Sequence, residues 1–321
     1  KLYKSGKLVA EKYYKNNIKI GTYKDYYDNG NLKKEYSYKR GLLEGPSNEY
    51  YITKNLKSEK NYRKGKKKGL FSFYYDNGTL KQTILYEMNK IKSEKNYKNG
   101  LKHGVSKDFY ASGKLLSESY YNEDKKVGKE NKFFETGQLQ SEKNFENGQQ
   151  IGKFEKYFKT GDIQFESTYE NGKQEGTAKE YFKNGQIKLN LLFKNDQLNG
   201  IYKEYRNTGE LLFEKNYING IKNGNSKKYY QSGNIEEDYN FNNDELDGEI
   251  KEYHGIGTLS SISHYVNGKQ DGKMKKFYSN GLLKMEIVFD QGKALNGATY
   301  LEHGVKKDLT HAHFNSMGLE Y

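Results

Sequence analysis

Cysteine and tryptophan are absent from this chain of 321 residues, and proline occurs once, at Pro46. Without cysteine the chain has neither disulfides nor thiolate metal sites. No run of about 18 apolar residues occurs, so the sequence predicts no membrane-spanning helix. Only 33% of the residues are hydrophobic, and the mean hydropathy is −1.11. Such a composition excludes a thick hydrophobic core.

Low hydrophobicity with high charge is typical of disordered chains. Here, however, 15% of the residues are aromatic, and they recur at fixed positions. Glycines recur with a step of 24, and the same step extends towards the N-terminus through Gly21, Gly45 and Gly69. A fixed period of this length predicts a repeat architecture. The later glycines of the series are at positions 104, 128, 152, 176, 200, 224, 248 and 272.

Three positions keep their residue type in all eleven full copies of the repeat. One is always Leu or Ile, as at Leu32, and two are always aromatic, as at Tyr26 and Tyr38. Aromatic and β-branched residues between glycine-containing turns predict two short strands joined as a hairpin. About thirteen such units predict an all-β fold, an elongated hairpin array that is either an antiparallel meander or an open solenoid.

The loop inside each hairpin ends in glycine in all copies but one, which has Thr53 and Lys54 instead. The residue before this glycine is Asn in only four copies and Ser, Thr or Ile elsewhere. A two-residue type I′ loop needs positive φ at both central residues, which Thr and Ile tolerate poorly. We therefore expect a three-residue loop with the glycine in a bulge.

This loop sets Tyr157 opposite Ile163 and places Tyr169 on the same face, because strand side chains alternate. We expect these positions to form the core stripe. The other face then carries the second aromatic of each pair beside a recurring glutamate. Because that glutamate follows the repeat symmetry, we interpret it as a cross-strand partner for lysines and not as a catalytic group. The glutamates are Glu35, Glu59, Glu118, Glu142, Glu166, Glu214 and Glu286.

The period is interrupted between Gly69 and Gly104, where the step is 35. The extra residues, Lys90–Gly100, nearly copy Asn55–Gly65 and predict one inserted strand. An odd strand reverses the direction of every later one. We expect either a bend at residues 80–90 or a strand that leaves the sheet as a loop.

These breaks divide the chain into four parts. Residues 1–79 are basic repeats, and residues 80–103 hold the repeat with the inserted strand, which we interpret as a joint. Residues 104–296 are regular repeats. Residues 297–321 diverge from the pattern and predict a C-terminal capping unit, because an array must end in an edge that recruits no further strands.

Each copy therefore holds a glycine, an aromatic pair, a turn, Leu or Ile, a glutamate, an aromatic and an Asn-Gly turn, over about residues 1–296. This order resembles the bacterial MORN-variant repeat. The resemblance implies a hairpin array used for binding, without chemistry of its own. Proteins built from this repeat include the YwqK-like family, described as antitoxins, and various secreted or cell-envelope proteins. We therefore expect a secreted or cell-envelope location for this chain over a cytoplasmic one. Eukaryotic MORN repeats carry a tryptophan, so their lipid-binding role transfers poorly to this chain.

Candidate catalytic and metal-binding residues are few. His311 and His313 would share one face of a strand, as a metal site requires, with His303 as a third ligand. Since no cysteine assists them, we interpret them as surface histidines. The glycine turns have neither the Walker spacing nor the context of a dinucleotide site. We therefore predict no enzyme, no catalytic residue, no cofactor and no metal.

Charge is distributed unevenly. Residues 1–103 hold 25 Lys/Arg against 10 Asp/Glu, whereas residues 104–321 hold 30 against 32. We expect a scaffold that binds a protein partner. The alternative is an anionic polymer or membrane surface bound through residues 1–103; nucleic acid is not favoured. Tyrosine suits contact surfaces because it offers large area at low entropy cost. We predict that Tyr27, Tyr51, Tyr75 and Tyr110 contact the partner.

Overall fold

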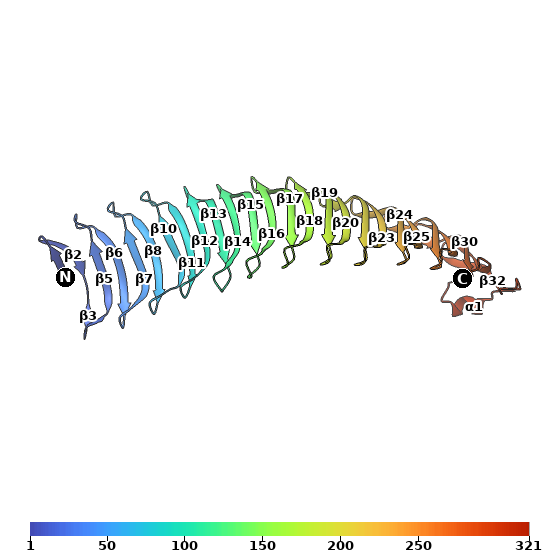
Figure 1. Cartoon of the computed structure of the whole chain (residues 1–321), viewed down its shortest axis with the longest axis horizontal. Helices are drawn as coiled ribbons and strands as arrows, with labels where there is room; N and C mark the ends of the chain where they lie inside the picture. Colours follow the sequence, from blue (N-terminus) through green and yellow to red (C-terminus); the bar gives the residue numbers. More distant parts are fainter. Residues whose placement is uncertain (321) are drawn as a thin grey trace. The chain divides into compact units, whose positions relative to one another are not determined.

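The structure, a computed structural model, describes residues 1–320. Strands account for 66% of the residues and helix for 2%, so the chain is all-β. It divides into two compact units, Lys1–Gly161 and Asp162–Tyr321. Within each unit the strands follow one another in chain order, as Figure 1 shows, and pair antiparallel with their neighbours. Each unit is thus an open antiparallel meander, which confirms the predicted fold class.

The first unit contains seventeen strands, of which β3 and β4 form a separate small hairpin. They are β1 (Leu2–Lys4), β2 (Lys7–Glu11), β3 (Tyr14–Lys15), β4 (Ile18–Lys19), β5 (Gly21–Tyr26), β6 (Leu32–Lys39), β7 (Leu42–Tyr50), β8 (Leu56–Arg63), β9 (Lys66–Lys67), β10 (Gly69–Tyr74), β11 (Leu80–Glu87), β12 (Lys90–Lys98), β13 (Leu101–Phe109), β14 (Leu115–Asn122), β15 (Lys125–Phe133), β16 (Leu139–Glu146) and β17 (Gln149–Tyr157).

The second unit contains the remaining strands and a short helix. They are β18 (Ile163–Glu170), β19 (Lys173–Tyr181), β20 (Ile187–Lys194), β21 (Gln197–Leu198), β22 (Gly200–Tyr205), β23 (Leu211–Ile218), β24 (Ile221–Tyr229), β25 (Ile235–Asn242), β26 (Glu245–Leu246), β27 (Gly248–Tyr253), β28 (Leu259–Val266), β29 (Lys269–Gln270), β30 (Gly272–Phe277), β31 (Leu283–Asp290), β32 (Lys293–Tyr300), β33 (Lys306–Asp308) and α1 (His311–Ser316).

The loop inside each hairpin has three residues, as predicted. In the β5–β6 hairpin the Tyr27 N–H donates to the Asn31 carbonyl at 2.9 Å, and the Gly30 N–H donates to the Tyr27 carbonyl at 2.8 Å. Gly30 has a φ of 83°, the left-handed conformation that glycine adopts at little cost. Where the glycine is missing, Lys54 takes the same place with a φ of 77°.

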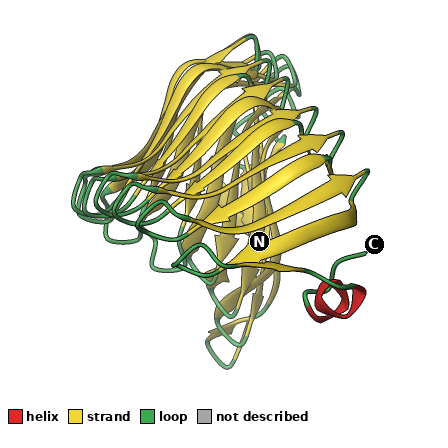
Figure 2. Cartoon of the chain, turned by 90° about the vertical axis from the view of Figure 1, so that its right-hand side faces the viewer, coloured by secondary structure: helices red, strands yellow, loops and turns green. Residues whose placement is uncertain are grey.

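Successive hairpins are joined by a tighter loop of two residues. Between the paired residues Lys39 and Leu42, Arg40 and Gly41 have φ values of 50° and 80°. Two positive φ values define a type I′ loop, which matches the right-handed twist of the flanking strands. Figure 2 shows the loops gathered at the strand ends.

The glycine that begins each repeat lies in a strand bulge. Tyr38 pairs with Leu43 and Tyr36 pairs with Ser47, so three residues oppose one. Gly45, in the middle of that bulge, has a φ of 81°. Because other residues adopt this conformation only under strain, the bulge explains why glycine recurs there.

Burial within the sheet is sparse. Only twelve apolar side chains are buried in residues 1–320. The predicted opposition holds, since Tyr26 pairs with Leu32 and Tyr181 pairs with Ile187. Both members of these pairs are only half-buried. The predicted core stripe is wrong, because a bulge between Asp25 and Tyr26 places Tyr26 on the face of Glu35, whereas Tyr38 lies on the other face. Deep burial recurs at another position, two places after the repeat glycine, as at Tyr23, Phe71 and Ala178.

The C-terminal residues leave the hairpin pattern. Helix α1, coloured red in Figure 2, buries Phe314 against Ile287, Phe289 and Ala294. This cluster covers apolar side chains of the last hairpins, which stabilises the end of the second unit. The strand predicted for His311 and His313 is wrong. They lie in the helix, where residues two apart do not share a face.

Candidate binding faces

We call the two sheet faces of each repeat the aromatic face and the ion-paired face. The aromatic face carries the residue two places after the repeat glycine, such as Tyr23 or Phe71, which are 1% and 2% exposed. Cross-strand neighbours pack against it: the ring centroids of Phe71 and Tyr86 are 4.7 Å apart, and those of Tyr23 and Tyr38 are 4.8 Å apart. Such edge or tilted ring pairs stabilise a sheet beyond the area that they bury.

The ion-paired face carries lysines directly opposite the recurring acidic residue. Lys24 lies 3.4 Å from Glu35, and Lys203 lies 3.0 Å from Glu214. The predicted role of the glutamate as a lysine partner is thereby confirmed at these positions. The charges of this face therefore largely neutralise one another. The same repeat positions pair Lys107 with Glu118, Lys227 with Asp238 and Lys275 with Glu286.

The lysines of the aromatic face have a different environment. A lysine two places before the repeat glycine lies over the ring of the last aromatic of the same repeat. Four of these five lysines have no carboxylate partner within residues 1–320, whereas Lys126 pairs with Glu130. Each of the four unpaired ammonium groups is thus held by a ring face and stays available to an external anion. The contacts are Lys19 over Tyr38 at 5.0 Å, Lys67 over Tyr86 at 4.7 Å, Lys102 over Tyr121 at 5.2 Å, Lys126 over Phe145 at 5.0 Å and Lys222 over Phe241 at 5.2 Å.

The four tyrosines predicted to contact a partner lie at the hairpin loops, where their hydroxyls bind neighbouring strands. The hydroxyls of Tyr27, Tyr51 and Tyr110 donate to backbone carbonyls 23 residues further on, at 2.7, 2.8 and 2.7 Å. The Tyr75 bond is longer, 3.4 Å to the carbonyl of Tyr97. These tyrosines therefore link successive hairpins. Their role at a partner interface stays a prediction.

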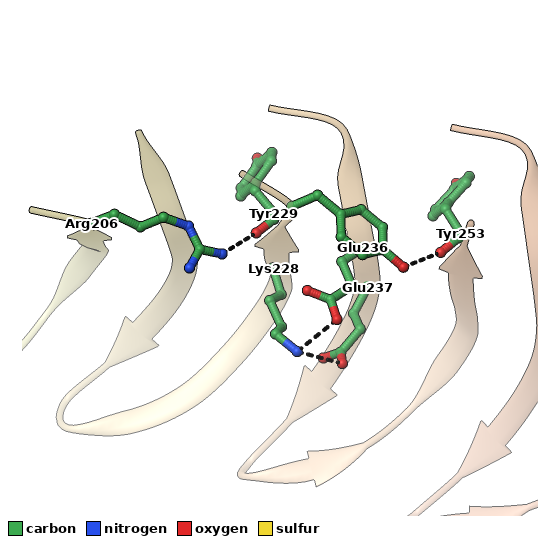
Figure 3. Close-up of polar contacts among 7 residues, drawn as sticks. Arg206, Lys228, Tyr229, Glu236, Glu237 and Tyr253 are labelled. Carbon is green, nitrogen blue, oxygen red and sulfur yellow. Dashed lines mark hydrogen bonds and ion pairs between the residues drawn. The ribbon is translucent and has the colours of Figure 1, made fainter. Parts of the chain in front are cut away.

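The same link recurs in the second unit with other residue types. Figure 3 shows Arg206 in the tyrosine position, its Nη2 donating to the Tyr229 carbonyl at 3.0 Å. The Tyr230 hydroxyl donates to the Tyr253 carbonyl at 2.8 Å. Lys228 Nζ, also in Figure 3, bonds Glu236 at 2.9 Å and Glu237 at 3.2 Å. This position thus often holds a donor long enough to reach the next repeat, although Phe134, Phe158 and Phe182 carry none.

The inserted strand β12 lies within the sheet, paired with β11 and β13, so it does not leave as a loop. The pairing register between β11 and β12 differs from the register between β6 and β7. Tyr86 pairs with Ile91 and Leu85 with Ser93, so this bulge holds one extra residue, whereas the bulge between β6 and β7 holds two. An extra single residue moves every later side chain to the opposite face.

The aromatic face therefore changes sides at β12. Thr83, on the ion-paired face of β11, pairs with Lys95, which in turn pairs with Ser106 on the aromatic face of the next repeat. The 3.5 Å hydrogen bond from the Thr83 hydroxyl to the Tyr97 hydroxyl agrees with this register. Within the first unit, the aromatic face of the repeats before β12 and that of the repeats after it thus lie on opposite surfaces of the sheet. A bend at residues 80–90 stays a prediction.

One carboxylate on the aromatic face is buried. Glu130 is 8% exposed, is ion-paired with Lys126, and accepts a 3.2 Å hydrogen bond from the Ser119 hydroxyl. Burial opposes ionisation, but these two partners outweigh it and hold the pKa of Glu130 below its usual value. Burial lowers the pKa of the neighbouring Lys143 ammonium. Because Glu130 is paired, it is a structural carboxylate here.

No group of three or more potential metal-ligating side chains occurs in residues 1–320. Over the same range, no helix has the length and apolar character needed to cross a bilayer. His313 Nδ1 accepts a 3.0 Å hydrogen bond from the Thr310 N–H and so helps begin helix α1. His313, whose spacing from His311 suggested a metal site, thus makes a structural contact instead.

The family described as "MORN repeat variant" matches nine segments of the chain, together more than half of its length. No curated protein matches the chain. The matched segments are residues 19–40, 67–88, 102–123, 126–147, 150–171, 174–195, 198–219, 222–243 and 270–291.

Similarities to solved structures are remote. A crystal structure of TcdB2-TccC3-Cdc42 is 10% identical with a TM-score of 0.18, and the aligned region covers 94% of this chain and 20% of that one. The Tc holotoxin pore of Photorhabdus luminescens is 11% identical, with a TM-score of 0.15 and coverages of 97% and 18%. A porin-like protein from Bacteroides uniformis is 9% identical, with a TM-score of 0.17 and coverages of 78% and 88%. The chain spans about a fifth of the first two proteins.

Proposed function

Because the chain belongs to the family of proteins built from the MORN repeat variant, we propose that it is a non-catalytic repeat scaffold that binds a protein partner. The proposed contact surface is the aromatic face, which lies on one surface of the sheet before β12 and on the other surface after it. Repeat arrays present surfaces of many equivalent units, and such surfaces suit macromolecules better than small ligands.

The observation that carries this proposal is the contrast between the two faces. On the ion-paired face, lysines such as Lys24 and Lys107 are neutralised by the glutamate opposite. On the aromatic face, Lys19, Lys67 and Lys102 lie over rings and have no carboxylate partner. Aromatic side chains are enriched at the centre of protein interfaces, and unpaired charges give an interface electrostatic complementarity to its partner.

The non-catalytic part of the proposal rests on symmetry. The repeated carboxylates serve in ion pairs that recur from hairpin to hairpin, whereas a catalytic group needs an environment that sets it apart. Glu130, the carboxylate that does have such an environment, is already bound to Lys126 and Ser119.

Two triple variants of equal charge test the proposal. Lys19→Gln/Lys67→Gln/Lys102→Gln removes ammonium groups from the aromatic face. Lys24→Gln/Lys107→Gln/Lys129→Gln removes three from the ion-paired face. Each immobilised protein would be exposed to an extract of the source cells and its bound proteins quantified by mass spectrometry. We expect the first variant to lose its partner about tenfold relative to the second. Equal retention by both would contradict the proposal.

A second candidate function is binding of an anionic polymer or membrane surface through residues 1–103, favoured by their 25 basic against 10 acidic residues. Salt separates the two. Binding to a polyanion should weaken steeply between 50 and 200 mM salt, as counterion release requires, and a protein interface with an aromatic centre should change little. An antitoxin-like or cell-envelope role is a special case of protein binding, and a toxin gene beside this one would support it.

A further inference from the structure

The aromatic face of the second unit has a hollow of about 190 Å³ between β23, β24 and β25. Its walls combine rings with ammonium groups, and one serine lies in the middle. The lining includes Phe213, Lys215, Lys222, Ser226, Tyr239 and Phe241.

Ser226, which lines the hollow, occupies the position two places after the repeat glycine. In several other repeats that position holds a large side chain, such as Tyr23, Phe71 or Ile250, each 5% exposed or less, whereas Ser47, Ser106 and Ala178 are small residues there. Around Phe71 the neighbouring groups are similar, since Lys60 and Lys67 lie near aromatic rings there too. The Phe71 ring fills the space that a serine side chain leaves open.

Ser226 is 7% exposed, and its Oγ has no hydrogen-bond partner in the structure. A buried hydroxyl without a partner is destabilising, because water is excluded and nothing replaces it. A hydroxyl that lines a hollow and is unsatisfied in the free protein points to an acceptor supplied from outside.

The charges around the hollow favour an anion. Lys215 lies 4.3 Å from the ring centre of Phe213, and Lys222 lies 5.2 Å from that of Phe241. Neither has a carboxylate partner within residues 1–320. Lys228 is bound to Glu237 at 3.2 Å. Two unpaired ammonium groups therefore face a lining whose one carboxylate is already neutralised.

Size and ring placement narrow the class of occupant. Pockets for small-molecule ligands are commonly about 300–1,000 Å³, so this one suits a single side chain. The faces of Phe213 and Phe241 lie beneath ammonium groups, which leaves them poorly placed to stack on a sugar or a nucleic-acid base. A short side chain with an anionic end fits both restrictions.

We propose that this hollow binds the carboxylate of a Glu or Asp side chain in an acidic segment of the protein partner. The carboxylate accepts hydrogen bonds from Lys215 Nζ, Lys222 Nζ and Ser226 Oγ, and its methylene groups pack against Phe213 and Tyr239. This inference rests on the proposed protein-binding function and adds the chemistry of the partner.

The probe for a test is a fluorescein-labelled decapeptide of alternating Glu and Ala, with a Gln/Ala decapeptide as the uncharged control. Fluorescence anisotropy with the full chain measures the Kd. We expect the Glu peptide to bind at least about tenfold more tightly than the Gln peptide, since three charge-assisted or hydroxyl hydrogen bonds depend on the carboxylate.

Three variants locate the binding. Lys215→Gln/Lys222→Gln should raise the Kd of the Glu peptide about tenfold. Ser226→Phe should abolish binding by filling the hollow with a side chain that the array accommodates at Phe71. Lys203→Gln/Lys275→Gln removes the same charge from the ion-paired face of the second unit and should leave the Kd within about twofold. Circular dichroism confirms that each variant is folded.

Equal weakening by the Lys215/Lys222 and Lys203/Lys275 pairs would overturn the inference, because only net charge would then matter. Tight binding of the Glu peptide to Ser226→Phe would overturn it as well. Stronger competition by a heparin hexasaccharide or a dT10 oligonucleotide than by unlabelled Glu peptide would assign the hollow to a polyanion instead. If these tests fail while cellular partners are still captured through Lys19, Lys67 and Lys102, the proposed function stands without this site.

Discussion

Replacing Tyr110 by Phe removes one hydroxyl that links two successive hairpins. The Tyr110 hydroxyl donates to the Phe133 carbonyl at 2.7 Å, near the optimum for such a bond, and the side chain is half-buried. The net contribution of one hydrogen bond is about 1 kcal/mol. Since the change leaves the ring in place, we expect Tyr110→Phe to cost about that amount.

The loss should be local, because each hairpin contacts mainly its neighbours. Hydrogen exchange monitored by mass spectrometry is therefore the suitable assay. A cost of about 1 kcal/mol corresponds to roughly fivefold faster exchange in peptides that cover β14 and β15. Peptides from distant hairpins should be unchanged.

Two matched substitutions sharpen the test. The Tyr75 hydroxyl lies 3.4 Å from its acceptor, beyond the usual range, so Tyr75→Phe should change exchange by less than about twofold. Phe134 occupies the same repeat position without a hydroxyl, so Phe134→Tyr should slow exchange by about threefold through a new bond to the Tyr157 carbonyl. Equal effects of the Tyr110 and Tyr75 changes, or no effect of either, would refute the assigned role of these hydroxyls.

Three further predictions concern the sheet itself. Deleting Lys90–Gly100 restores the step of 24 and should bring the aromatic faces before and after the deletion to one surface of the sheet. Cysteines introduced at Lys67 and Lys102 would then lie about 10 Å apart and should be crosslinked by a short bismaleimide. With β12 in place the same two cysteines should not be crosslinked. Lys54→Gly relieves a left-handed backbone at φ 77° and should add about 1 kcal/mol of stability, seen as a higher Tm. The free energy of unfolding should fall as pH drops below about 4.3 towards the lowered folded-state pKa of Glu130, because protonation breaks its ion pair; Glu130→Gln should reduce that slope in acid denaturation.

Much of the fold could be predicted from the sequence, because it follows from local rules that each copy repeats. The period indicated hairpins. A two-residue loop was excluded because Thr adopts positive φ only at a high energetic cost. That choice led to the correct opposition of Tyr26 and Leu32. In the copy that lacks this glycine, the structure shows Lys54 in the left-handed conformation that glycine adopts elsewhere.

The most buried position could not be found in this way. It holds Tyr23 in one repeat, Ser47 in the next and Glu130 in a third, so it has no constant residue type. Its burial is caused by the bulge at the preceding glycine, which the hydrophobic pattern does not record. The hollow at Ser226 lies at the same position and was missed for the same reason.

The effect of the inserted strand was predicted in part. An odd strand does prevent the later repeats from continuing the earlier ones by simple translation. The surface on which the later aromatic faces lie depends on whether the bulge between β11 and β12 holds one or two extra residues. The pairing of Leu85 with Ser93 shows that it holds one. A difference of one residue in a bulge has no reliable sequence signature.

Site-specific photo-crosslinking on strand β15 tests the central claim, that the aromatic face binds the partner, most directly. Lys132 and Lys129 are both exposed lysines of this strand, on the aromatic and the ion-paired face respectively. A benzophenone amino acid would replace each in turn before exposure to the captured partner. We predict a crosslinked product from position 132 and none from position 129; crosslinking from position 129 alone would contradict the account.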